Sequence, residues 1–99
     1  MPIAHEELEN VGKRIRQIRL LHKLTQEEFG QIIGKSTATV YGYESGKILP
    51  PTSVIMTISS LFHVSLKEIF GLKADIKWDD DAIILYYEAL LEESGEENE

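Results

Sequence analysis

The stretch from Ser36 to Lys47, STATVYGYESGK, has the residue types of a helix that contacts another molecule. A serine that can cap a helix opens it, and a glycine that can end one lies next to its last residue. Its threonine and tyrosine hydroxyls can both donate and accept hydrogen bonds. Between Ser36 and Lys47 there is no Arg, Lys, Gln or Asn, the side chains that usually hydrogen-bond to the polar edges of a partner. Such a helix is smooth, so its backbone could approach a partner closely.

No other part of the sequence has the spacing of a reactive site. GKS at residues 34–36 resembles part of a phosphate-binding loop, but Phe29 stands where that loop needs a glycine. The histidines at positions 5, 22 and 63 have no second ligand at metal-binding spacing. The chain contains no cysteine, which excludes a disulfide framework and a Cys-based zinc site. We therefore expect no enzyme, no metal and no cofactor.

The charge of the chain is unevenly distributed. The net charge is −7, yet residues 1–72 carry eight Lys or Arg against seven Asp or Glu, whereas residues 73–99 carry two against ten. Five basic residues fall within one short segment: Lys13, Arg14, Arg16, Arg19 and Lys23. Such a cluster can form a basic face on an acidic protein. No apolar run approaches the ~20 residues that a membrane-spanning helix needs.

Periodic apolar residues predict several helices. From about residue 6 to residue 22 they recur every three or four positions, as in an amphipathic helix. The predicted core-facing stripe is Leu8, Val11, Ile15, Ile18 and Leu21. Further helices are predicted from Pro51 or Thr52 to about Phe62 and over residues 66–70. No segment shows the alternation of a strand, which indicates an all-α protein.

Two short helices, residues 26–33 and 37–45, lie between these elements. Their boundaries are marked by a capping box of Thr25 with Glu28, by Ser36 as an N-cap, and by Gly34 and Gly46 after the last residues. Phe29, Ile32 and Ile33 would face inward from the first of them. Two short helices joined by a tight turn form a helix-turn-helix pattern, although a helical hairpin in a small bundle would show the same pattern.

The residues around this pair resemble one family. RIRQIR lies in the first helix, LTQEEF opens the second, VYGYESGK closes the third, and HVSLKEIF leads through the fifth, with a proline near the start of the fourth. Together these motifs resemble the Cro/phage-repressor, or XRE-type, helix-turn-helix family over about residues 11–72. The resemblance implies an all-α, five-helix lambda-repressor-like domain that binds double-stranded DNA. Its third helix would enter the major groove while the second lies across the backbone.

The resemblance also implies roles for individual residues. Gln26 corresponds to a glutamine that contacts a DNA phosphate, and Arg19 and Glu44 correspond to an ion pair between the first and third helices. Arg19 lies beside the apolar stripe, where an unpaired cation would be costly. Base-facing positions are occupied by Thr37, Ala38, Tyr41 and Gly42, and DNA-backbone positions by Thr39 and Lys47, with Lys35 and Ser36 at the turn. The candidate phosphate ligands are Lys13, Arg14, Arg16, Lys23, Lys35 and Lys47.

Thr37, Ala38 and Gly42 depart from the family, whose members often carry Arg, Gln or Lys there. The methyl groups of Thr37 and Ala38 can contact a thymine methyl. Tyr41 would be the one large exposed side chain, and Tyr43 is assigned to the core. Direct base readout would then be sparse, which leaves specificity to DNA shape and water. The rival interpretation is that these positions have lost contact with DNA and the domain binds protein.

We predict a cytoplasmic, sequence-specific transcriptional regulator, a repressor that acts as a homodimer on a palindromic operator. The alternative is an antitoxin-like or anti-regulator module whose C-terminal segment binds another protein. The DNA-binding domain would comprise residues 1–72. It would be followed by a linker at 73–78, a C-terminal helix within 79–94 and an acidic tail at 95–99.

The predicted C-terminal helix carries more apolar surface than a helix can leave in solvent. One side of it is formed by Ile83, Ile84, Tyr87, Leu90 and Leu91. Either the helical domain covers this side, with Trp78 anchoring the linker, or a second chain covers it across a two-fold axis. We expect the second arrangement, because residues 1–72 already resemble a complete family domain with little open core.

Overall fold

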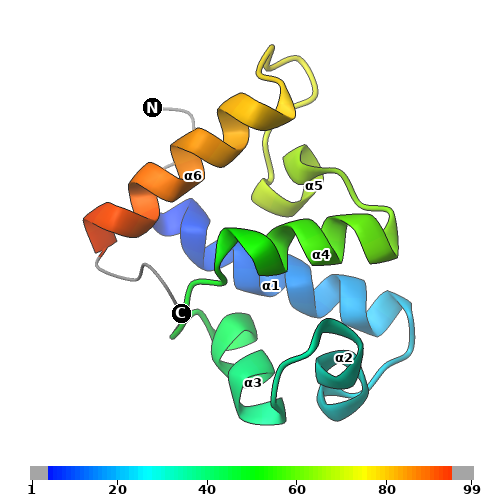
Figure 1. Cartoon of the computed structure of the whole chain (residues 1–99). Helices are drawn as coiled ribbons and strands as arrows, with labels where there is room; N and C mark the ends of the chain where they lie inside the picture. The colour runs from blue at the N-terminus through cyan, green and yellow to red at the C-terminus, as the bar shows by residue number, and fades with distance from the viewer. Residues whose placement is uncertain (1–4, 95–99) are drawn as a thin grey trace.

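The computed structural model describes residues 5–94, with side chains described from residue 10 to residue 93. The helices are α1 (His5–Leu21), α2 (Gln26–Ile33), α3 (Thr37–Ser45), α4 (Thr52–Phe62), α5 (Leu66–Phe70) and α6 (Asp80–Ser94). Within this range there is no strand, which confirms the predicted all-α class. Figure 1 shows α2 and α3 at one end of the molecule and α6 near the other, with α1 and α4 between them.

The short helices begin and end where their capping residues were predicted. Thr25 Oγ1 accepts a hydrogen bond from the Glu28 backbone N–H at 3.0 Å, and the Glu28 carboxylate accepts one from the Thr25 N–H at 2.9 Å. Ser36 Oγ accepts one from the Thr39 backbone N–H at 3.1 Å. The glycines after α2, α3 and α5 have left-handed backbone angles: Gly34 (φ 76°), Gly46 (φ 83°) and Gly71 (φ 69°). These caps satisfy helix-end groups that lack partners within the helix, so local sequence determines the boundaries.

α1 supplies one wall of the core. Val11, Ile15 and Ile18 are buried, as their spacing predicted. Leu21 was placed on the same stripe but is 80% exposed, because α1 ends there and the chain turns away at Lys23, whose φ is 58°. The side chain of Leu8 lies outside the described residues.

α2 buries a narrower face than its sequence predicted. Phe29 and Ile33 are buried, and the Phe29 ring stacks on that of Phe62 in α4, with centroids 5.3 Å apart. The expectation that Ile32 also faces inward is wrong, because its side chain is 46% exposed. Phe29 and Ile33 are one turn apart and share a side of the helix, whereas Ile32 is rotated by about 100° from Ile33.

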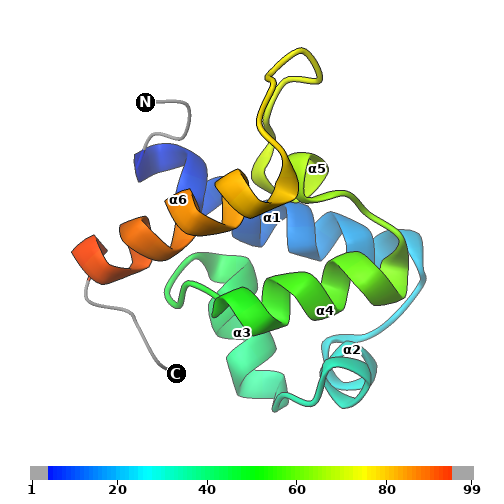
Figure 2. The ribbon, with the colours of Figure 1, turned by 45° about the horizontal axis from the view of Figure 1, so that its top comes forward.

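α6 packs on α4 and α5 (Figures 1 and 2). Ile83 and Tyr87 are completely buried, and Leu90 and Leu91 are nearly so. The Tyr87 ring lies against that of Phe70 in α5, with centroids 4.8 Å apart. The five preceding helices therefore do not close the core by themselves, and the same chain provides the missing wall.

This packing corrects the expectation that the apolar side of α6 faces a second chain. Four of the five residues assigned to that contact are in the core of their own chain: Ile83, Tyr87, Leu90 and Leu91. Ile84 is half-buried against the same core, and the neighbouring Leu85 is the large apolar residue of α6 that stays exposed. An apolar helix face has the same sequence whether its own chain or a partner covers it, so the pattern could not decide between the two.

The segment between α5 and α6 is held against the helices. Lys67 Nζ donates to the carbonyl oxygen of Ile76 at 2.6 Å. The Trp78 ring packs edge-on against that of Tyr86 in α6, with centroids 5.3 Å apart. Trp78 thus helps to anchor α6, as the alternative arrangement required. Between residues 5 and 94, no helix combines the length and the apolar character needed to cross a membrane.

Replacing Ile83 by Ala should lower the free energy of unfolding of the monomer by about 2–5 kcal/mol, because it leaves a cavity where a side chain was completely buried. The matched control is Leu85→Ala on the same helix. Its side chain is 69% exposed, so its loss should change the free energy of unfolding by less than about 0.5 kcal/mol. Urea unfolding at several protein concentrations measures both. Equal losses for the two variants would contradict the placement of α6 in the monomer core.

Candidate nucleic-acid interface

α3 presents one side to solvent and buries the other. Val40 and Tyr43 are buried, whereas Thr37, Ala38 and Tyr41 are exposed. These exposed residues occupy the first turn and a half of the helix, next to the Ser36 cap. Along these turns the exposed side therefore consists of two small side chains and one aromatic ring, which leaves the helix backbone accessible to a close partner.

α1 approaches α3 so closely that the contact requires a glycine. A Cβ at Gly12 would overlap the carbonyl oxygen of Tyr43 and would lie 3.0 Å from that of Glu44. Because Gly12 has no side chain, the backbones of the two helices can pack directly against each other. Gly12 thus sets the distance between α1 and the last turn of α3.

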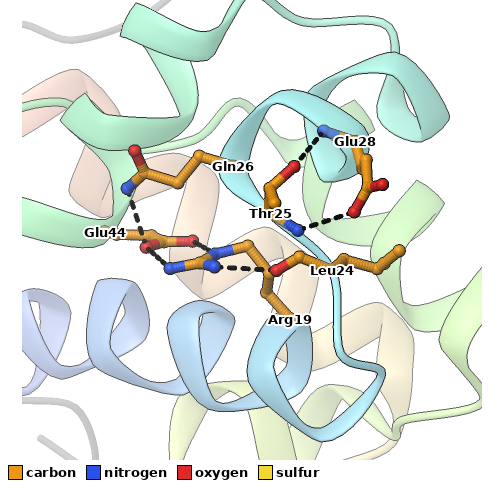
Figure 3. A network of polar contacts seen from close by, with 6 residues as sticks. All are labelled: Arg19, Leu24, Thr25, Gln26, Glu28 and Glu44. Atoms are coloured by element: carbon orange, nitrogen blue, oxygen red, sulfur yellow. Dashed lines mark hydrogen bonds and ion pairs between the residues drawn. The ribbon is translucent and has the colours of Figure 1, made fainter.

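A buried ion pair joins the same two helices (Figure 3). Arg19 Nε donates to Glu44 Oε2 at 2.7 Å, and Arg19 Nη2 donates to Glu44 Oε1 at 3.0 Å. Arg19 Nη1 also donates to the carbonyl oxygen of Leu24 at 2.8 Å, immediately before the Thr25 cap of α2. The ion pair expected between the first and third helices is therefore present. It also fixes the turn that leads into α2, a contact that sequence reasoning missed because a backbone carbonyl leaves no signal in the residue types.

Arg19 keeps its positive charge in this pair. The hydrogen bond to Glu44 raises the pKa of Arg19, against the opposing effect of burial, and the charge of Glu44 adds to the rise. Arg19 therefore stays protonated throughout the pH range in which proteins fold. Two parallel hydrogen bonds between a guanidinium and a carboxylate have a defined geometry, so the pair orients α3 relative to α1 as well as attracting it.

Gln26, the first residue of α2, belongs to the same network. Its Nε2 donates to Glu44 Oε1 at 3.2 Å (Figure 3). One N–H of the Gln26 amide is thus directed at α3, and the N-terminal end of α2 adds the partial positive charge that favours anions. The contact of Gln26 with a DNA phosphate stays a prediction. The structure shows that the side-chain amide of Gln26 is held by Glu44.

Comparison with known proteins assigns this arrangement to a family. A helix-turn-helix family model matches residues 15–69, more than half of the chain. The chain belongs to the Cro/C1-type (XRE) helix-turn-helix family. Its fold is accordingly the lambda-repressor-like one that the sequence motifs implied, with α6 as an addition beyond the matched residues.

Relatives of this helix-turn-helix protein include two bacterial proteins and an archaeal one. YobD of Bacillus subtilis, named an uncharacterised HTH-type transcriptional regulator, is 36% identical over 63 residues, 64% of this chain and 56% of YobD. Antitoxin PezA of Streptococcus pneumoniae is 39% identical over 61 residues, 62% of this chain and 39% of PezA. An uncharacterised HTH-type transcriptional regulator of Methanocaldococcus jannaschii is 33% identical over 62 residues, 63% of this chain and 94% of that protein. The chain thus spans about half the length of YobD and less of PezA. No solved structure is a significant match.

The helix-turn-helix brings Tyr41 and Lys47 together, although they lie on different elements. Tyr41 is 54% exposed, and Lys47 Nζ lies 5.9 Å from the centroid of its ring. That distance is within the range of a cation–π contact, so the ring holds the lysine beside α3. At the other end of the helix, Ser36 Oγ donates to Thr39 Oγ1 at 3.0 Å, which holds both hydroxyls at the start of α3.

Gly42 does not belong to the exposed side of the helix, so the expectation that it faces bases is wrong. It is buried, and a Cβ there would lie 2.5 Å from Ile48 Cδ1. The Gly42 carbonyl oxygen accepts hydrogen bonds from the backbone N–H groups of Lys47 at 3.0 Å and Ile48 at 3.1 Å. The chain after α3 therefore folds back over the helix at this point. Ile48 is a supporting residue that helix periodicity could not reveal, because it lies in a loop.

The predicted phosphate ligands differ in their accessibility. Four of them are exposed: Lys13, Arg16, Lys23 and Lys47. Lys35 is half-buried, and so is Arg14, whose Nη1 donates to the carbonyl oxygen of Asn10 at 3.3 Å. The Arg14 guanidinium also fills the space beside Gly71, so it lies on the side of α1 that packs on α5. Among the described residues, no three side chains of metal-ligating type are placed to hold a metal ion.

Replacing Glu44 by Ala should destabilise the protein by about 3–5 kcal/mol, because it leaves the Arg19 charge buried and unpaired. Glu28→Ala and Glu68→Ala are controls of the same type. Each removes an exposed carboxylate from a capping box and should cost about 1 kcal/mol or less. Urea unfolding of the three variants checks this order, and equal midpoints would show that the Arg19–Glu44 pair contributes nothing specific.

Proposed function

We propose that this protein is a sequence-specific DNA-binding transcriptional regulator, a repressor that acts in the cytoplasm as a homodimer on a palindromic operator. The observation that carries the proposal is the support of α3. Gly12 and the Arg19–Glu44 pair hold its buried side to α1, and its opposite side is smooth and exposed. A helix positioned in this way can enter the major groove without rearrangement. Membership of the helix-turn-helix family supports the same function.

Thr37, Ala38 and Tyr41 make the base contacts in this proposal. The methyl groups of Thr37 and Ala38 suit a thymine methyl, and the hydroxyls of Thr37 and Tyr41 can donate to or accept from base edges. Three such residues provide few direct contacts, so DNA shape and bridging water supply the rest of the specificity. The small side chains favour this mode, because they let the backbone of α3 lie close to the groove.

Charge supports an orientation with α2 and α3 toward the DNA. Four exposed basic residues are available to phosphates: Lys13 and Arg16 in α1, Lys23 in the turn after it, and Lys47. The acidic residues of α6 are exposed: Asp80, Asp81, Glu88, Glu92 and Glu93. In both ribbon views α6 lies away from α2 and from the N-terminal end of α3 (Figures 1 and 2). This distribution repels DNA from the α6 end, and with few cations at the other end the non-specific affinity is modest.

The two-fold contact of the proposed homodimer lies outside the apolar side of α6, because that side covers its own core. We place the contact on α4 and α5. Met56 and Leu61 of α4 support this choice, because both are large apolar residues with about half of their surface in solvent.

A second candidate function is an antitoxin-like regulator that binds another protein as well as DNA. The similarity to Antitoxin PezA favours it. In that case Leu85, exposed on α6, is the residue of the C-terminal segment best placed to meet the partner. Relief of growth arrest when a toxin encoded beside the gene is co-expressed with this protein would support the idea, provided that Leu85→Asp abolishes the relief.

Selection of bound sequences from random duplex DNA should yield a palindromic or near-palindromic motif. A two-fold dimer presents both copies of α3 to one face of the duplex, so the half-sites should be about one helical turn apart. The experiment is best run at low salt, because phosphate contacts contribute more to the affinity for DNA when the salt concentration is low. Selection that enriches no motif under these conditions would refute DNA binding of the proposed kind, and a motif with a single half-site would refute the symmetric dimer.

Tyr41→Ala should change the preferred base at particular positions of the selected motif, by about 1–3 kcal/mol. Lys47→Ala should instead weaken binding to all sequences alike and reduce the slope of log affinity against log salt by about one, because a phosphate contact carries no base information. Tyr41→Phe divides this effect, since it keeps the ring beside Lys47 and removes only the hydroxyl, so a change of base preference in this variant as well assigns the contact to the hydroxyl. An unaltered motif and affinity for Tyr41→Ala would mean that Tyr41 does not face the bases.

A further inference from the structure

Tyr87 of α6 contacts the segment that follows α3, although it lies well beyond residue 69, where the family match ends. Its hydroxyl donates to the carbonyl oxygen of Pro50 at 2.5 Å, and both residues are completely buried. Figures 1 and 2 show the connection between α3 and α4 on the side of the domain that α6 covers. The added helix therefore reaches the helix-turn-helix through a specific polar bond as well as through apolar packing.

A short path leads from Pro50 to the exposed side of α3. Two residues before it, Ile48 packs on Gly42, and the backbone N–H groups of Lys47 and Ile48 both donate to the Gly42 carbonyl oxygen. Lys47 in turn places its ammonium group over the Tyr41 ring. Residues 47–50 thus connect the buried side of α6 with the surface that faces DNA in the proposed function.

We propose that Tyr87 is a positioning residue for the DNA interface: its bond to Pro50 holds residues 47–50 against α3 and so presets Lys47 beside Tyr41. This inference rests on the DNA-binding function proposed above. An aromatic ring without a hydroxyl would fill the same space against Phe70. A buried hydroxyl is costly unless it is bonded, and the bond from the Tyr87 hydroxyl to Pro50 is directed at the loop that follows α3.

The test is a double-mutant cycle on DNA binding with the full chain and the selected duplex. Tyr87→Phe should weaken binding about three- to tenfold and reduce the salt slope, because Lys47 is no longer preset. In the Tyr87→Phe background, Lys47→Ala should cost less affinity than it does in the unmodified protein, since coupled residues are not additive. Tyr86→Phe is the matched control, because it removes a hydroxyl from the neighbouring tyrosine, whose ring packs on Trp78. Additive losses, or unmodified affinity for Tyr87→Phe, would overturn the positioning role.

Amide hydrogen exchange of the same variants, without DNA, separates positioning from general stability. In Tyr87→Phe the amides of Lys47 and Ile48 should exchange faster, while those of buried Val40 and Ile55 keep their rates. Uniform acceleration, or loss of the fold, would make Tyr87 a core residue only and would overturn the inference. The result does not depend on the proposed function. If the unmodified protein enriches no DNA motif, the proposed DNA-binding function is refuted. If a folded Tyr87→Phe variant binds DNA as tightly as the unmodified protein, only the positioning role of Tyr87 is refuted.

Discussion

Arg19 and Glu44 bring opposite charges into a region where each residue is only 8% exposed. Such a pair is costly to desolvate and is tolerated only when its hydrogen-bonding groups are satisfied. Here Arg19 donates to Glu44 and to the Leu24 carbonyl, while Glu44 also accepts from Gln26. The network therefore includes α1, the turn before α2, the first residue of α2, and the last turn of α3. An apolar contact could contribute as much stability, but it would not specify the angle at which α3 is held.

The core explains why this domain needs a sixth helix. Short helices such as α2 and α5 cover little surface, and a chain of this size buries a smaller fraction of its surface than a larger domain does. Ile83 and Tyr87 complete the core, and α6 lies beside α4 and α5 rather than projecting from them. As a consequence, an element outside the family match contributes to the loop that follows α3. The acidic residues of α6 therefore lie far from α2, and they do not repel an anionic partner that binds at α2.

The surface of α3 indicates how recognition with few side chains can operate. Thr37 and Ala38 add little bulk, and the ring of Tyr41 holds the Lys47 ammonium group beside the helix. Preset groups lose little conformational freedom on binding, which partly compensates for the small number of contacts. Gly42, on the opposite side, allows Ile48 to pack against the helix. Small residues thus have two effects on α3. Thr37 and Ala38 keep its exposed side free of bulk, and Gly42 lets the following loop pack closely on its buried side.

The amino-acid sequence by itself determined the elements of this protein. Thr25, Glu28 and Gly34 act on backbone groups three or four residues away, so the boundaries of α2 could be predicted, and the same holds for α3 with Ser36 and Gly46. The Arg19–Glu44 contact was implied by resemblance, since no local rule connects residues 25 positions apart. Only the tertiary structure decided what covers α6, where residues 46–50 run, and which side of α3 Gly42 occupies. These properties depend on how distant segments pack, and an apolar or small residue has the same local pattern whichever neighbour it meets.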